Sequence, residues 1–72
     1  MTTTEVQFVK NSLSEICNRK FGFDAIKIDK IVESVIDDVC QDIEECADED
    51  FNSDDVEIAF TRILFSKLIP LN

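Results

Sequence analysis

Hydrophobic residues recur at helical spacing in three separate stretches of this 72-residue chain. In the first stretch they follow one another at steps of three or four with polar residues between them, which predicts a helix over residues 4–20. Thr3 or Thr4 is expected to cap its start. Gly22, the only glycine of the chain, is typical of the residue just beyond a helix C-terminus. The apolar face of this helix consists of Val6, Val9, Leu13, Ile16 and Cys17.

The second stretch carries the longest apolar face, and the positions between its apolar residues are almost all acidic or polar. This pattern predicts an amphipathic helix over residues 26–47. Many residues of the face are β-branched, so packing rather than intrinsic propensity must hold the helix together. The face consists of Ile28, Ile31, Val32, Val35, Ile36, Val39, Cys40, Ile43, Cys46 and Ala47.

The third stretch predicts a helix over residues 53–69, capped by Asn52 or Ser53 and ended by Pro70. It has two apolar faces, and a helix that is apolar nearly all round is normally buried nearly all round. One face carries Val56, Ala59, Phe60, Ile63 and Leu64, and the second carries Ile58, Phe65, Leu68 and Ile69.

These three helices predict an all-α fold, a small three-helix bundle, with residues 1–72 forming a single domain. Its core is expected to join the apolar face of the second helix to Val9, Leu13, Ile16, Phe60, Ile63 and Leu64. A core of this size typically supplies no more than about 3–5 kcal/mol. We therefore expect a partner chain to complete the fold.

The charge of the chain is concentrated in its middle. The sequence has 16 acidic and 7 basic residues, for a net charge of −9. Residues 31–61 together include twelve acidic residues and no basic one, whereas residues 1–30 include four acidic and five basic residues. This balance excludes a protein that wraps a phosphate backbone directly. It also creates a negative field that attracts basic partners.

Candidate catalytic, metal and cofactor sites are absent from the sequence pattern. The chain has no histidine, and its paired carboxylates lie on a polar helix face where nothing supplies a pocket. Asp48, Asp50 and Asn52 match the first ligands of an EF-hand calcium loop, but Ser53 and Ala59 occupy the positions of its turn glycine and bidentate glutamate. We expect no enzyme activity, no metal and no cofactor.

The three cysteines, Cys17, Cys40 and Cys46, lie on apolar faces and are expected to be buried, reduced thiols. None stands in a CxxC arrangement, and zinc would lack a fourth ligand. No secretory signal is visible, and no apolar run approaches the roughly 20 residues needed to span a bilayer. These features predict an intracellular protein, nuclear or cytoplasmic, that does not enter a membrane.

Two stretches resemble histone-fold proteins. Residues 51–62 are similar to the second loop and third helix of that family, in which Asp-Val is followed three residues later by Ala and an apolar residue. Residues 16–25, with Gly-Phe-Asp, are similar to the first helix and loop of the TFIID-associated factors. Small centromere and Fanconi-pathway histone-fold subunits are of similar length. The central helix expected here is about two or three turns shorter than that of the family.

The resemblance implies obligate pairing with another histone-fold chain rather than independent DNA binding, within a chromatin or transcription complex. Together with the second apolar face of the third helix, it predicts a non-enzymatic protein–protein interaction subunit that dimerises through this helix. The partner is expected to be a basic or apolar helical chain, with a second copy of this chain as an open alternative. The predicted partner-binding residues are Phe8, Ile58, Phe65, Leu68 and Ile69.

The alternative hypothesis belongs to another functional class. An acidic protein can mimic nucleic acid and occupy the basic groove of an enzyme that handles DNA or RNA. In that case carboxylates of the acidic surface would stand in for phosphates. These are Asp37, Asp38, Asp42, Glu45 and Asp48. Salt distinguishes the two hypotheses, because ionic contacts weaken steeply as salt rises while apolar contacts change little.

Overall fold

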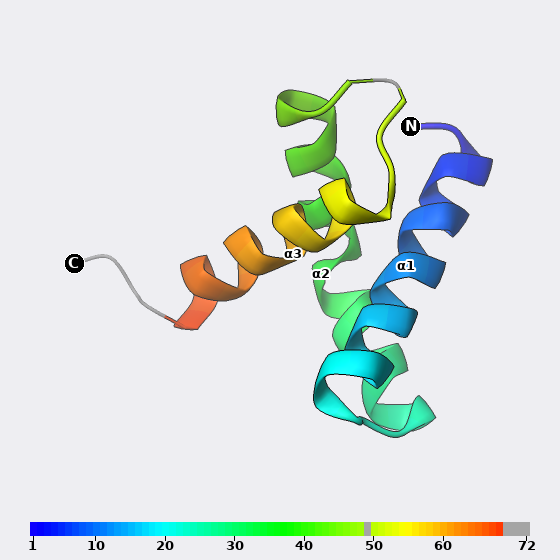
Figure 1. The fold of residues 1–72 in the computed structure, drawn as a ribbon, viewed down its shortest axis with the longest axis vertical. Helices are drawn as coiled ribbons and strands as arrows, with labels where there is room; N and C mark the ends of the chain where they lie inside the picture. The colour runs from blue at the N-terminus through cyan, green and yellow to red at the C-terminus, as the bar shows by residue number, and fades with distance from the viewer. Residues whose placement is uncertain (49, 69–72) are drawn as a thin grey trace.

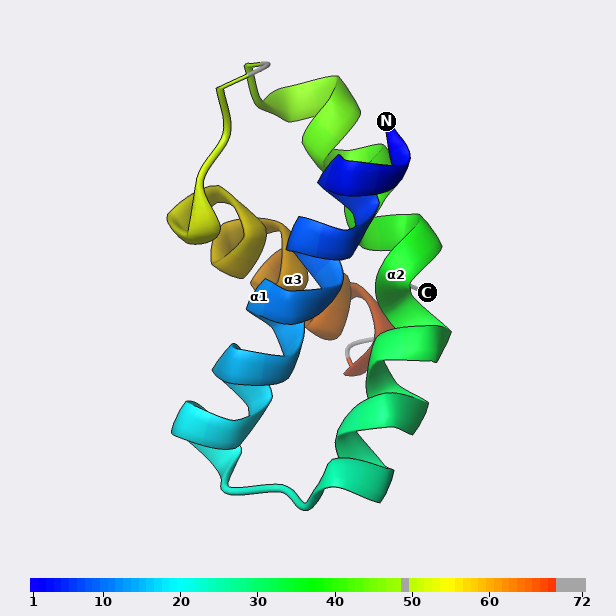
Figure 2. The same cartoon turned by 90° about the vertical axis from the view of Figure 1, so that its right-hand side faces the viewer.

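The computed structural model describes residues 1–48 and 50–68. It contains three helices, α1 (Thr3–Phe21), α2 (Ala25–Cys46) and α3 (Ser53–Leu68). α1 and α2 run antiparallel to each other, and α3 crosses this pair so that its C-terminal end extends past it (Figures 1 and 2). Each helix contacts both of the others. The predicted all-α three-helix bundle is confirmed, and the helix boundaries lie within one residue of those expected from the sequence. The exception is the predicted end of the third helix at residue 69 before Pro70, which lies outside the described residues.

Both ends of α1 are closed by side-chain and backbone hydrogen bonds. The Thr2 hydroxyl accepts from the backbone N–H of Glu5 (3.1 Å), and the Glu5 carboxylate accepts from the backbone N–H of Thr2 (2.9 Å). The cap is therefore Thr2, one or two residues before the expected Thr3 or Thr4. At the other end Gly22 adopts φ 65°, and its N–H donates to the carbonyl of Asn18. This left-handed conformation favours glycine and confirms the predicted stop.

α2 and α3 begin at side-chain caps of the same kind. The Asp24 carboxylate accepts from the backbone N–H of Lys27 (2.8 Å) at the start of α2. At the start of α3 the Asn52 side-chain oxygen accepts from the N–H groups of Asp54 (2.9 Å) and Asp55 (3.2 Å). The Asp55 carboxylate in turn accepts from the N–H of Asn52 (3.0 Å). Of the two caps expected for α3, the structure selects Asn52.

The core lies where the three helices meet, and it agrees with the predicted set. Ile63 and Leu64 are half-buried against its edge. In the part of the chain that the structure describes, no helix has the length and apolar character needed to cross a membrane. The buried hydrophobic residues are Val9, Leu13, Ile16, Cys17, Ile28, Val32, Val35, Val39, Ile43, Val56, Ala59 and Phe60.

One cysteine departs from the expectation that all three are buried. Cys17 is buried and Cys40 is half-buried, and burial raises the pKa of both thiols. Cys46 is exposed. It is the last residue of α2, so the chain turns away there and the apolar face of α2 ends before it reaches this position.

Candidate protein-interaction surface

α3 places its apolar residues on two sides, and only one side is covered. Val56, Ala59 and Phe60 face the core and are buried. Ile58 and Phe65, two helical turns apart and therefore on one face, are 51% and 60% exposed. We call the face that carries Ile58 and Phe65 the outer face of α3. It is a hydrophobic surface that neither α1 nor α2 covers within the described residues.

A groove of about 300 Å³ lies beside this face, between α3 and the end of α1. The buried side chains of Ile16 and Phe60 line its inner part, and Leu64, Phe65 and Phe21 line it nearer to solvent. Phe21 is 48% exposed and extends the apolar surface of α3 onto α1. The hydrophobic pattern did not single out Phe21, because it is the last residue of its helix and does not belong to the apolar face of α1.

Ion pairs with Glu57 hold α3 against the end of α1 along the same groove. Arg19 Nη2 lies 3.3 Å from Glu57 Oε1, and Lys20 Nζ pairs with Glu57 Oε2. Arg19 Nε also pairs with Glu15 (3.2 Å). The hydrogen bond from Lys20, assisted by its charge and by Arg19, holds the pKa of Glu57 below its usual value. These contacts keep Phe21 and Phe65 on opposite sides of one groove.

The structure does not place Phe8, Leu68 or Ile69, the other predicted partner-binding residues, in this groove. Phe8 is 40% exposed, but its ring packs on that of Phe51, with centroids 5.8 Å apart, in the connection between α2 and α3. The structure therefore does not bring Phe8 together with Phe65. Leu68 is the last residue of α3, and Ile69 lies outside the described residues.

The predicted acidic surface is partly neutralised by bases on α3. Asp42 accepts hydrogen bonds from Arg62 Nε (3.0 Å) and Nη2 (2.6 Å), and its side chain is only 17% exposed. The hydrogen bond to Asp42 raises the pKa of Arg62. Asp38 lies 3.7 Å from Lys67 Nζ. Contrary to the expected open carboxylate, Asp42 is thus committed to an internal ion pair, because α3 crosses α2 at this level.

Asp37, Glu45 and Asp48, the remaining members of the acidic surface, are exposed. Within the described residues no three His, Cys, Asp or Glu side chains are grouped so that they could hold a metal ion. Comparison of the chain with protein-family models, with curated proteins and with solved structures finds no match.

Proposed function

We propose that this chain is a non-enzymatic protein–protein interaction subunit that pairs with another protein chain through the outer face of α3. The observation that carries the proposal is the exposure of Ile58 and Phe65 on the outer face of α3, beside a groove that Phe65 and the exposed Phe21 line. Aromatic and aliphatic side chains that enter a partner's pockets supply most of the binding energy in protein interfaces. Contiguous apolar surface of this kind on a small domain is typical of an interaction site.

The arrangement of the helices explains why the chain cannot cover this surface itself. The C-terminal end of α3 extends past the α1–α2 pair (Figure 1). α1 and α2 both use their apolar faces in the core, so neither has a second apolar face to offer. Covering the exposed parts of Phe65 and Phe21 would contribute on the order of 1 kcal/mol each. A partner helix laid along the groove would supply this cover.

A histone-fold chain is the form of partner that the sequence resemblance supports, within a chromatin or transcription complex. The resemblance rests on residues 16–25 and 51–62, which form the end of α1 with its loop and the start of α3. A structure of the complex would test it. Crossing of the α2 helices of the two chains would support histone-fold pairing, whereas contact with α3 alone would contradict it.

Photo-cross-linking from the groove identifies the partner. A photoreactive phenylalanine analogue placed at Phe65 should cross-link one protein in an extract of the cells that make this chain, because position 65 lies at the interface. The same analogue at Asp37, an exposed position on α2, is the matched control. Equal cross-linking from both positions would contradict the assignment.

Substitution then measures the interface. We expect Ile58→Ser with Phe65→Ser to weaken binding of the identified partner by about tenfold to a hundredfold, since hot-spot residues each contribute roughly 1–2 kcal/mol or more. Helix content by circular dichroism should stay unchanged. Phe8→Ser, at the other end of α1, should change affinity little. Unchanged affinity in the double variant would refute the proposed interface.

The nucleic-acid-mimic hypothesis remains the alternative, and the same complex tests it. Four of its five carboxylates are exposed, although Asp38 is paired with Lys67 of α3, and Asp42 is half-buried in its ion pair with Arg62. Binding through the outer face of α3 should change little between about 0.1 and 1 M salt, over which the Debye length falls from about 10 to 3 Å. Loss of binding over this range, insensitive to Phe65→Ser, would favour the mimic.

A further inference from the structure

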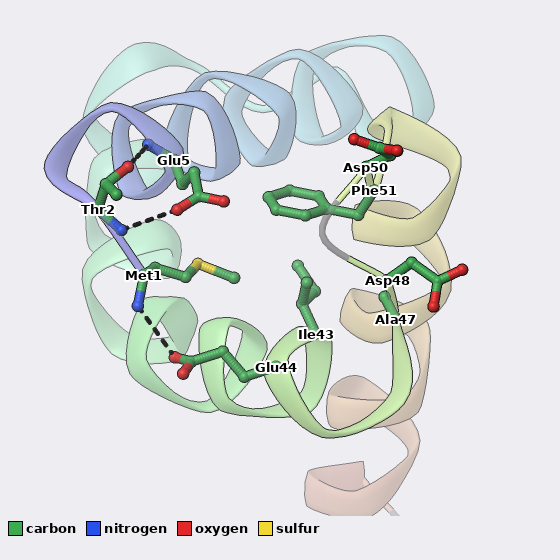
Figure 3. A pocket seen from close by; sticks show the side chains of 9 residues that line it. All are labelled: Met1, Thr2, Glu5, Ile43, Glu44, Ala47, Asp48, Asp50 and Phe51. Carbon is green, nitrogen blue, oxygen red and sulfur yellow. Dashed lines mark hydrogen bonds and ion pairs between the residues drawn. The ribbon is translucent and has the colours of Figure 1, made fainter.

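A hollow of about 650 Å³ lies away from the groove, between the start of α1, the end of α2 and the connection to α3 (Figure 3). Its apolar part is formed by Met1, Ile43, Ala47 and Phe51, and the side chain of Met1 reaches into it (Figure 3). Ile43 is buried, and the ring of Phe51 points into the hollow (Figure 3). Phe51 is in turn supported by the exposed ring of Phe8. The hollow thus offers an apolar floor with an aromatic wall.

Four of the described residues that line the hollow carry a carboxylate, and none of these lining residues is a lysine or an arginine. Glu5 is occupied by its hydrogen bond with Thr2, and Glu44 lies 3.5 Å from the terminal ammonium group. Asp48 and Asp50 are exposed, and neither forms an ion pair among the contacts of the described residues. The hollow is therefore apolar inside and negatively charged around its rim.

We propose that this hollow docks a basic amphipathic segment of another protein. An apolar side chain of the segment would pack on Phe51 and Ile43, while an arginine or lysine beside it would face Asp50. A second basic side chain would reach over the rim to Asp48, whose carboxylate points outward from the hollow (Figure 3). Charge complementarity selects this occupant, because an acidic segment would meet four carboxylates and a phosphate backbone would be repelled in the same way. The long apolar stems of arginine and lysine suit a site with an apolar floor and charged rim.

The site is separate from the outer face of α3 and does not depend on the proposed function. The hollow adjoins the first turn of α1, whereas the groove adjoins its last residue, Phe21. The net charge of −9 attracts any basic peptide over a distance. A docking site differs from this general attraction, because removing carboxylates at the hollow must lower the affinity for a basic peptide more than removing carboxylates elsewhere.

Two charge-matched double variants separate these effects. Asp48→Asn with Asp50→Asn removes two charges at the hollow, and Glu33→Gln with Asp37→Asn removes two exposed charges elsewhere on α2. The probe is a fluorescein-labelled peptide of about 12 residues, three helical turns, with leucines on one face and arginines on the other. Its affinity is measured by fluorescence anisotropy at about 0.15 M salt.

We expect the first variant to raise the Kd of the peptide about fivefold or more, and the second to raise it less than about twofold. Phe65→Ser should leave the Kd unchanged. A peptide with glutamine in place of arginine should bind much more weakly. In nuclear magnetic resonance spectra, the arginine peptide should shift the amide signals of Glu5, Ile43 and Phe51.

Three outcomes would overturn the proposal. Equal weakening by the two double variants would mean that the peptide responds only to the overall charge. Sensitivity to Phe65→Ser instead of Asp48→Asn with Asp50→Asn would place the peptide in the groove. Absence of binding by the wild-type protein would exclude the site, provided that circular dichroism shows the protein to be folded.

Discussion

α2 and α3 both contribute to the core, but they distribute their apolar residues differently. Nearly all apolar positions of α2 lie on one face, and that face is buried or half-buried except at Cys46 at its end; Ile26, near the start of the helix, lies off this face and is exposed. α3 buries Phe60 and leaves Ile58 and Phe65 largely in water. The side of α2 that faces solvent is polar. The side of α3 that faces solvent, its outer face, is apolar, although a polar surface is expected there.

This difference shows that the apolar residues of one small chain can serve two purposes, packing in its own core and binding to another molecule. A single apolar face at helical spacing indicates where a helix meets its own domain. A second apolar face indicates surface that the domain does not use, and in a stable protein such surface is typically covered by another molecule. The comparison therefore assigns stability to one set of residues and binding to the other, which substitutions can test directly.

Identical substitutions on the two faces of α3 should have very different effects on stability. Phe60→Ala removes a buried side chain and should lower the free energy of unfolding by about 3–5 kcal/mol. Phe65→Ala removes an exposed one and should change it by no more than about 0.5 kcal/mol. Urea unfolding followed by circular dichroism measures both. Since the core supplies only about 3–5 kcal/mol in total, the Phe60 variant is expected to be largely unfolded.

A large loss of stability in Phe65→Ala would contradict the division between the two faces. It would mean that Phe65 belongs to the core and that the groove is part of the folded unit. The affinity of the cross-linked partner provides the complementary measurement, because Phe65→Ala should weaken that complex while the isolated protein remains folded.

For the two ion pairs between α2 and α3, we expect a smaller difference in stability between substitutions of Asp42 and of Asp38. Asp42→Asn weakens two hydrogen bonds from Arg62 to a carboxylate that is mostly shielded from water, and should cost about 0.5–1 kcal/mol. Asp38→Asn affects only the longer contact to Lys67 and should cost less than about 0.3 kcal/mol. Urea midpoints at low and high salt measure the two. Equal losses would show that Asp42 acts as an ordinary surface charge.

The smallest expected effect is the pH dependence of stability that comes from Glu57, which joins α3 to the end of α1. Because the pKa of Glu57 is lowered in the folded state, its ion pairs stabilise the fold above the ordinary glutamate pKa of about 4.3. This contribution is lost as pH falls through the lowered pKa. The wild type should therefore have a higher urea midpoint than Glu57→Gln at pH 7, and the difference should vanish on acidification. A difference that grows on acidification would contradict the assignment.

The hydrophobic pattern predicted the helices and most of the core because both depend on local spacing. Leu13, Val39 and Phe60 lie on apolar faces that repeat at helical steps, and all three are buried. Gly22 marked the end of α1 because a left-handed residue favours glycine. Helix positions, helix ends and core residues of this kind can be predicted from the sequence without knowing how the helices cross.

The details of the surface depend on that crossing, and the sequence could not supply them. Arg62 and Asp42 are far apart in the chain, so their pairing could not be seen in a charge count by segments. Phe21 became part of the candidate interaction surface because α3 packs beside the end of α1, where Ile16 and Phe60 share the core. Likewise, the hollow at Phe51 joins the first turn of α1 to the end of α2, which requires their antiparallel arrangement.

The short connections between the helices also have a consequence for how the chain reaches its structure. α1 ends at Phe21 and α2 begins at Ala25, and α3 follows α2 after a connection of similar scale. Packing partners are thus close along the chain, and helical domains with such low contact order fold within about microseconds to milliseconds. The exposed aromatic residues of α3 therefore spend little time beside an unformed core, which limits aggregation before a partner arrives.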